Sequence, residues 1–115
     1  MIVEVPDREK IYISGPMLGK IDNNIEAFNW FEKALSISMY CEVINPTSFR
    51  IKSDTGSEVL DREQWLEIDL MVLRKCDAIF MMPGWHKSEG ACIEYAEAKK
   101  CGLKIYGVDF EENEQ

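Results

Sequence analysis

The segment at residues 88–94, Ser-Glu-Gly-Ala-Cys-Ile-Glu, carries residue types that could act on a small anionic substrate. It follows a Pro-Gly turn and a lysine, so Ser88 is placed to cap a helix whose first-turn N–H groups would bind an anion. Gly90 and Ala91 would keep that turn bare, which lets a ligand come close to the backbone. The alternative is a plain N-cap that binds nothing.

Glu94 is the candidate nucleophile of this segment. Residues three, four or seven positions away can share its face of a helix, and four such neighbours are small. They are Gly90, Ala91, Ala98 and Cys101. A carboxylate on such a stripe, beside an anion site, could be held for attack on a substrate. The alternative is an ordinary exposed glutamate.

Three further groups could join this site. Asp69 lies between two apolar residues of a helical pattern and could face the same loops, although a surface aspartate is the commoner case. Tyr12 lies in a strand-like run that stops at Gly15-Pro16, and the chain has no GxGxxG or GxxxxGK[ST] motif. Trp85 could stack on a base, or it could pack against the adjacent helix.

Strand-like and helix-like segments alternate along the chain and would position these groups. The predicted strands span residues 10–14, 41–44, 77–82 and 103–108. The predicted helices are capped by Asp22 or Asn23, by Asp61 and by Ser88, and the last ends near Cys101, before Gly102. Residues 47–58 are expected to form a mobile loop. This alternation predicts a parallel sheet, with ligands at loops 14–20, 45–61 and 83–88 beyond its carboxyl ends.

Composition limits the possible functions. The 115 residues are enough for one domain, residues 1–115, and 46% apolar with 30% charged residues is typical of a soluble globular protein. The net charge of −8 argues against binding to a nucleic acid polymer. No stretch resembles a signal peptide or a membrane span, so we expect a cytoplasmic protein that does not bind membranes.

The cysteines and the single histidine do not form a metal-binding pattern. The four cysteines are scattered without a CxxC pair, and His86 has no neighbouring ligand set. We therefore expect no metal and no cofactor.

Several of these segments together resemble the nucleoside 2-deoxyribosyltransferase superfamily, nearest its 2'-deoxynucleoside 5'-phosphate N-hydrolase branch and short phage and bacterial relatives. The matching pieces are residues 12–17 (YISGPM), Asp69-Leu70, Cys76-Asp77 and residues 88–94. The resemblance implies a flavodoxin/Rossmann-like α/β fold, a three-layer sandwich with a four- or five-stranded parallel sheet. It also implies cleavage of an N-glycosidic bond.

The resemblance assigns roles to individual residues. Glu94 would be the nucleophile at the anomeric carbon, Asp69 the acid that helps the base to leave, and Tyr12 the aromatic that positions the nucleophile. Substrate contacts would come from the first loop and from the segment around the third helix start, namely Ser14, Gly15, Pro16, Met17, Trp85, Lys87, Ser88 and Gly90. Ser88 stands where transferases acting on free nucleosides have an Asp, and a Ser at a helix N-terminus favours a 5'-phosphate.

The chain also departs from the hydrolase pattern. Leu18 stands where that branch often has a basic residue, and the nearest cation is Lys20, while His86 and Lys87 could supply the charge. The family usually forms homodimers or larger homo-oligomers. Apolar residues that could supply the contact are Phe28, Trp30, Trp65 and Met71.

The leading hypothesis is hydrolysis of a 2'-deoxynucleoside 5'-monophosphate to free base and deoxyribose 5-phosphate. The alternatives are a nucleoside deoxyribosyltransferase and a non-catalytic protein that sequesters a nucleotide. An interaction domain that binds no ligand is the remaining possibility.

Overall fold

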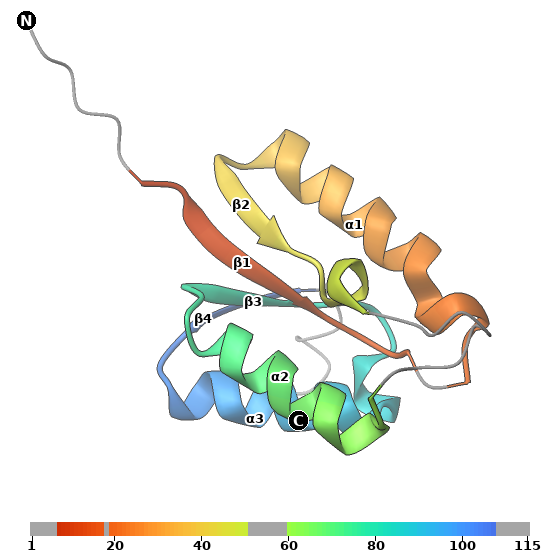
Figure 1. Cartoon of the computed structure of the whole chain (residues 1–115). Coiled ribbons are helices and arrows are strands. Elements are labelled where there is room, and N and C mark those ends of the chain that lie inside the picture. The colour runs from red at the N-terminus through yellow and green to blue at the C-terminus, as the bar shows by residue number, and fades with distance from the viewer. Residues whose placement is uncertain (1–6, 18, 51–59, 108–115) are drawn as a thin grey trace, which may run out of the picture.

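A four-stranded parallel sheet forms the centre of the protein (Figure 1). The computed structural model describes residues 7–17, 19–50 and 60–107. The strands are β1 (Glu9–Ser14), β2 (Cys41–Ile44), β3 (Ala78–Met81) and β4 (Lys104–Gly107). They lie in the order β2-β1-β3-β4, which is the flavodoxin-like order. The predicted fold class is confirmed.

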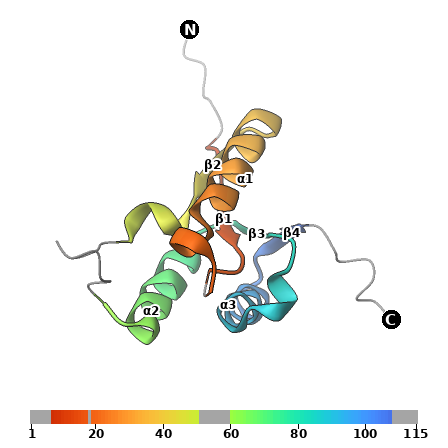
Figure 2. The same cartoon turned by 90° about the vertical axis from the view of Figure 1, so that its right-hand side faces the viewer.

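Helices cover both faces of this sheet, as the three-layer prediction requires. Figures 1 and 2 show α1 (Ile25–Ser38) on one face, with α2 (Arg62–Leu73) and α3 (Glu89–Lys100) side by side on the other. Short 3-10 helices cover Ile21–Asn24, Pro46–Phe49 and Trp85–Lys87. No helix in the described part of the chain is long and apolar enough to cross a membrane.

The side-chain alternation of β1 sends its residues to different layers. Ile13 packs with Phe28 on the α1 side, whereas Tyr12 packs with Leu73 in the core beneath α2 and α3. Tyr12 and Ser14 share one face of the strand because side chains repeat every two residues. Both are fully buried, so β1 delivers two hydroxyl groups to the layer between the sheet and α3.

Two of the three N-caps predicted from the sequence are confirmed. Asp61 caps α2 in a full capping box with Gln64, and Ser88 caps α3. The prediction that Asp22 or Asn23 caps α1 is wrong, because that helix begins at Ile25 after a 3-10 turn. Residues 22–24 have φ of 50°, 56° and 64°, a left-handed conformation that Asn and Asp tolerate better than most residues.

The segment predicted as a mobile loop begins with ordered structure. Pro46–Phe49 forms a 3-10 helix, and Asn45 anchors it by accepting hydrogen bonds from the Thr47 N–H at 3.0 Å and hydroxyl at 2.7 Å. The sequence pattern missed this turn because its polar residues bond locally rather than to solvent. The rest of the predicted loop, residues 51–59, lies outside the described residues.

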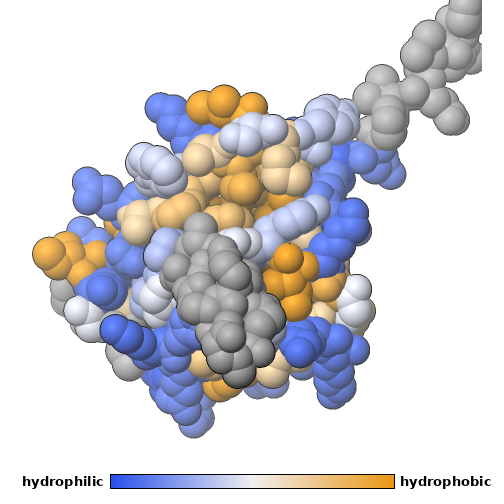
Figure 3. All heavy atoms as spheres, turned by 180° about the vertical axis from the view of Figure 1, so that it is seen from behind, coloured by the Kyte–Doolittle hydropathy of each residue, from blue (hydrophilic) through white to orange (hydrophobic). Residues whose placement is uncertain are grey.

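Apolar side chains that could form a contact between subunits divide into two groups. Phe28 and Trp65 are buried in the chain's own core, so the suggestion that they supply such a contact is wrong. Trp30 is 64% exposed and Met71 is 55% exposed. Figure 3 shows apolar colours gathered in the upper half of the rear face.

Candidate active site

A cavity of about 760 Å³ opens beyond the carboxyl ends of β1 and β3. The chain leaves β1 towards α1 on one face and leaves β3 towards α3 on the other, so this is the switch point at which ligands bind in such sheets. The volume is within the range of small-molecule sites. All three loops predicted to surround a ligand contribute to its wall, which includes Met17, Arg50 and Ser88.

Glu94 lies on the cavity wall with its carboxyl group held at both oxygens. The Tyr12 hydroxyl donates to Oε2 at 2.8 Å, and the Ser14 hydroxyl donates to Oε1 at 2.6 Å. Glu94 is only 6% exposed, which excludes the ordinary exposed glutamate. Tyr12 therefore does position Glu94, as expected from the resemblance. Ser14 was expected to bind substrate, but its buried hydroxyl is used on Glu94 instead.

Burial changes the protonation of two carboxyl groups in this cavity. Burial, and next the negative charge of Asp69, raises the pKa of Glu94 to about 8, against the hydrogen bonds from Ser14 and Tyr12. Burial also raises the pKa of Asp69 to about 6, although Arg50 opposes this shift. Between these two values the pair holds a single proton, which the ligand-free protein keeps mainly on Glu94.

Arg50 is a site residue that sequence reasoning missed. Its Nη2 donates to Asp69 Oδ2 at 2.9 Å, and its guanidinium lies 4.8 Å from the centroid of the Trp65 ring. The side chains of Arg50 and Asp69 are 11% and 4% exposed, so the ion pair is buried. The signal in the sequence that could have identified Arg50 was its position after a predicted strand. Arg50 follows a strand that ends at the same sheet edge as Ser14, but polar residues around it suggested only a loop.

The first turn of α3 borders the same cavity. The Ser88 hydroxyl accepts a hydrogen bond from the Ala91 N–H at 3.2 Å, which confirms the N-cap. Gly90 faces open space, since a Cβ placed there would meet nothing within 4 Å. Ser88 and Gly90 both line the cavity, and so do other predicted contact residues, namely Gly15, Pro16, Met17 and Lys87.

Gly15 is required by close packing. A Cβ at this position would lie 2.8 Å from the sulfur and 2.9 Å from the Cβ of Met82, closer than real atoms approach. The absence of a side chain therefore lets the first loop pass directly over the end of β3.

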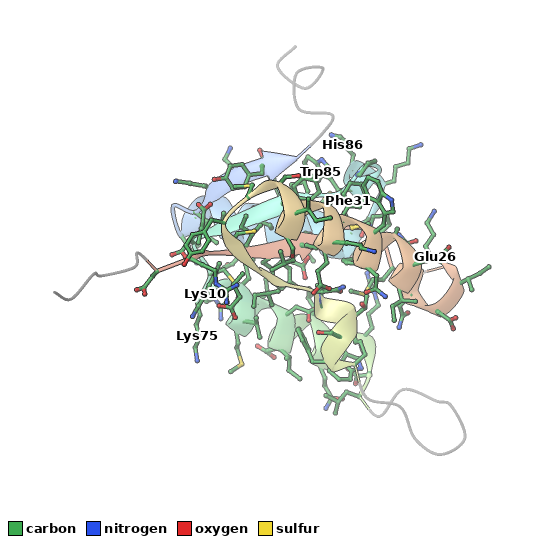
Figure 4. The ribbon with its side chains drawn as sticks, turned by 90° about the horizontal axis from the view of Figure 1, so that it is seen from above. Lys10, Glu26, Phe31, Lys75, Trp85 and His86 are labelled. Atoms are coloured by element: carbon green, nitrogen blue, oxygen red, sulfur yellow. The ribbon has the colours of Figure 1, made fainter. Side chains whose placement is uncertain are left out.

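Trp85 is not part of the cavity wall. It is 6% exposed and packs against Tyr95 of α3, with ring centroids 4.7 Å apart. His86 stacks on its outer side at 4.1 Å, and Figure 4 shows the two residues together. The expectation that Trp85 contacts substrate is corrected in favour of the alternative, packing on the adjacent helix. The physical reason is that burying this large ring against α3 removes more apolar surface from water than a loop position would.

Two of the three cationic residues expected near the substrate line the cavity. Lys20 and Lys87 line it, whereas His86 does not, and Leu18 lies outside the described residues. Arg62 also lines the cavity, where it pairs with Glu89 at 2.9 Å across the starts of α2 and α3. Within the described residues no group of three His, Cys, Asp or Glu side chains is arranged to hold a metal ion.

Removing the Tyr12 hydroxyl should perturb Glu94 directly. We expect Tyr12→Phe to raise the pKa of Glu94 further and to lower the free energy of unfolding by about 1–3 kcal/mol, because a buried acceptor loses its donor. Carboxyl titration by infrared spectroscopy and chemical denaturation would measure the two effects. The matched control is Tyr106→Phe, which removes a hydroxyl bonded to Glu9 at 3.0 Å outside the cavity. Equal effects of the two substitutions would contradict a special role for Tyr12.

Comparison with known proteins places this site within a family. A sequence model of the family described as Domain of unknown function (DUF4406) matches residues 9–107. This region contains Tyr12, Arg50, Asp69 and Glu94. No curated protein matches the chain.

Proposed function

The chain belongs to the DUF4406 family, and we propose that it is an N-glycosidase that splits a 2'-deoxynucleoside 5'-monophosphate into free base and deoxyribose 5-phosphate. One observation carries the proposal. A buried glutamate, held by two hydroxyl groups, faces a cavity beside a second buried carboxyl group. Pairs of carboxyl groups with different proton affinities are what glycosidic bond cleavage uses.

Glu94 and Asp69 take complementary roles in this reaction. The Glu94 carboxylate attacks the anomeric carbon while the bond to the base nitrogen breaks, and the bonding electron pair leaves with the base. Asp69 gives its proton to the departing base. Water then attacks the anomeric carbon of the glycosyl ester and returns a proton to Asp69, which releases deoxyribose 5-phosphate and restores the Glu94 carboxylate.

The resting proton position sets a condition for this reaction. Glu94 must lose its proton to act as a nucleophile, whereas Asp69 must carry one to act as an acid. Since the pair shares a single proton between about pH 6 and 8, its transfer from Glu94 to Asp69 supplies both requirements at once. The hydroxyl groups of Tyr12 and Ser14 assist this transfer because they stabilise the ionised form of Glu94.

The end of the cavity at Ser88 suits a 5'-phosphate. Ser88 is neutral, Gly90 leaves the first turn of α3 open, and Lys87 lies next to them on the cavity wall. Helix N-termini attract anions, and a nearby lysine adds to that attraction. This supports a monophosphate rather than a free nucleoside as the substrate.

The Ser88→Asp substitution should reverse this preference. Asp caps helices as well as Ser does, so the fold should persist, but its carboxylate would repel phosphate. We expect KM for the monophosphate to rise about tenfold or more, with a smaller change for the free nucleoside. Ser88→Thr is the matched control because it caps the helix and stays neutral. Equal losses in both variants would contradict phosphate binding at this end.

The proposal is tested by incubating the protein with each common 2'-deoxynucleoside 5'-monophosphate, and with modified pyrimidine forms, and separating the products by chromatography. Free base and deoxyribose 5-phosphate are expected in equal amounts from at least one substrate. The absence of base release from all of them would overturn the proposal. Addition of a second base separates the hydrolase from a deoxyribosyltransferase, which would form a new nucleotide.

A non-catalytic nucleotide-binding protein is the second candidate, and the protonation of Glu94 favours it. A carboxyl group with a pKa of about 8 is a hydrogen-bond donor at neutral pH, and a sequestering protein could use it as such. Such a protein would return its nucleotide intact after long incubation. Glu94→Ala would then weaken nucleotide binding, because it removes this donor.

We also propose that the enzyme works in the cytoplasm as a homo-oligomer. Its four cysteines are free thiols, which suits a reducing compartment. Trp30 and Met71 remain available for a contact between subunits because their side chains are exposed.

A further inference from the structure

The guanidinium of Arg50 is only partly hydrogen-bonded in its ion pair with Asp69. Arginine and a carboxylate can form two parallel hydrogen bonds, but here only Nη2 and Oδ2 are joined, at 2.9 Å. Nη1 of Arg50 is buried and finds no hydrogen-bond partner in the described part of the chain, whereas Asp69 also has the Glu94 carboxyl group as a hydrogen-bond partner. Buried polar groups in proteins are nearly always paired, so a donor left over on a cavity wall calls for a ligand that presents an acceptor.

Arg50 is held in place by its surroundings. It directly follows the 3-10 helix Pro46–Phe49, which is anchored by Asn45. The Asn45 side chain also donates to Asn29 at 2.9 Å and to Glu32 at 3.0 Å, which ties this turn to α1. The guanidinium is therefore presented at a defined position rather than on a free side chain.

The surroundings of Arg50 suit a flat and partly apolar group. Its guanidinium lies over the Trp65 ring, and Nη2 is 3.2 Å from the sulfur of Met17. The other cations on the cavity wall, Lys20, Arg62 and Lys87, are exposed. A phosphate keeps its hydration best beside the exposed cations, whereas a nucleobase gains from the aromatic and thioether contacts near Arg50.

We propose that Arg50 recognises the departing base and takes up the negative charge that develops on it. This inference rests on the proposed N-glycosidase function and extends it to the choice of leaving group. Arg50 would donate to a carbonyl oxygen or ring nitrogen of the base. A fixed cation in a buried site stabilises such charge more than water does. The ligand class is a nucleobase that presents a hydrogen-bond acceptor to Arg50.

Equilibrium binding separates this role from phosphate binding. In a Glu94→Gln background, which blocks turnover, calorimetry would measure the affinity for the four common 2'-deoxynucleoside 5'-monophosphates and for deoxyribose 5-phosphate. We expect Arg50→Met to weaken binding of at least one nucleotide about tenfold or more and to leave deoxyribose 5-phosphate unchanged. Arg50→Lys should restore part of the loss. Arg74→Met is the matched control, because Arg74 pairs with Glu97 outside the cavity.

Kinetics supply a second readout. If Arg50 takes up charge on the base, Arg50→Met should slow release of uracil more than release of 5-fluorouracil, because the fluorinated base is the better leaving group. A purely structural role would slow both equally. If Arg50→Met does not fold because Asp69 is left unpaired, the double substitution of Arg50→Met with Asp69→Asn removes the unpaired charge. Its affinities are then compared with those of Asp69→Asn alone, so that the difference reports on Arg50.

The outcomes distinguish this inference from the proposed function. Equal loss of affinity for nucleotide and deoxyribose 5-phosphate, or no loss for any nucleotide, would overturn the role of Arg50. Base release with equal slowing of both uracils would overturn it as well, while the N-glycosidase would stand. Nucleotide binding that depends on Arg50, without base release by the unmodified protein, would overturn the N-glycosidase and leave base recognition in place. No nucleotide binding at all would overturn both.

Discussion

Replacement of Glu94 by Gln is expected to reduce base release by roughly 10³- to 10⁶-fold, the range found when a nucleophile is removed from an enzyme. Gln has nearly the same shape as Glu but cannot attack the anomeric carbon. One of the hydroxyl groups of Tyr12 and Ser14 would turn to accept from the new amide, which a rotating hydroxyl can do. Single-turnover assays with the best monophosphate substrate would measure the loss.

Stability provides the internal check on this variant. The pKa of Glu94 is raised to about 8 in the folded protein from an ordinary 4.5, so the folded state keeps a proton that the unfolded state releases between these values. The unmodified protein should therefore lose stability as pH rises from about 4.5 to about 8, and Glu94→Gln should lack this part of the dependence. We expect the melting temperature of Glu94→Gln to match the unmodified protein near pH 4.5 and to exceed it at pH 8.5.

A matched control comes from the same helix. Glu97 lies one turn further along α3, outside the cavity, where it pairs with Arg74 at 2.7 Å. Glu97→Gln should retain base release and should not increase stability at pH 8.5. Retained activity in Glu94→Gln would refute the assignment of the nucleophile, even if the enzyme is an N-glycosidase.

Replacement of Asp69 by Asn should reduce base release by roughly 10²- to 10⁴-fold, the usual range for a general acid. The amide cannot give a proton to the departing base. The loss should be smallest for bases that leave easily, because these need the least assistance. Steady-state rates with uracil and 5-fluorouracil nucleotides would show the difference. Asp77→Asn is the matched control, since Asp77 accepts a hydrogen bond from the Lys10 N–H at 2.8 Å away from the cavity.

The shape of the pH profile tests the role of Asp69 as general acid more sharply than the size of the loss in activity. In the unmodified enzyme, kcat/KM should be bell-shaped, with its acid limb near pH 6 and its alkaline limb near pH 8, because only the singly protonated pair is active. Below this window Glu94 cannot ionise, and above it no proton remains for the base. Asp69→Asn should remove the alkaline limb and move the acid limb to the pKa of Glu94 alone.

The structure also predicts the direction in which Asp69→Asn moves the acid limb of the pH profile. The negative charge of Asp69 raises the pKa of Glu94, so a neutral Asn should lower it. An Asp69→Asn profile that keeps its alkaline limb near pH 8 would assign the acid to another group.

Local patterns were sufficient to predict the framework of this protein. Alternating strand and helix signals identified the four strands and three α-helices found among the described residues, because side-chain periodicity and turn residues act over a few positions. Asp61 and Ser88 were correctly identified as caps for the same reason, since a cap bonds to the backbone two or three residues ahead. The start of α1 was missed because Asn24 donates to the Pro16 carbonyl at 2.9 Å, a tertiary contact, instead of capping the helix.

The arrangement of the site was decided by contacts between distant parts of the chain. Residues 88–94 supplied a cap and a carboxyl group by sequence alone, but the bonds that hold Glu94 reach across 82 and 80 positions to Tyr12 and Ser14. The choice between core and cavity for Trp85, and the pairing of Arg50 with Asp69, also depend on which helices the sheet brings together. The proton affinities of Glu94 and Asp69 follow from burial, which no local pattern encodes. The sequence determined which groups are present and on which elements they lie, whereas only the tertiary structure determined their partners, their burial and therefore their charge.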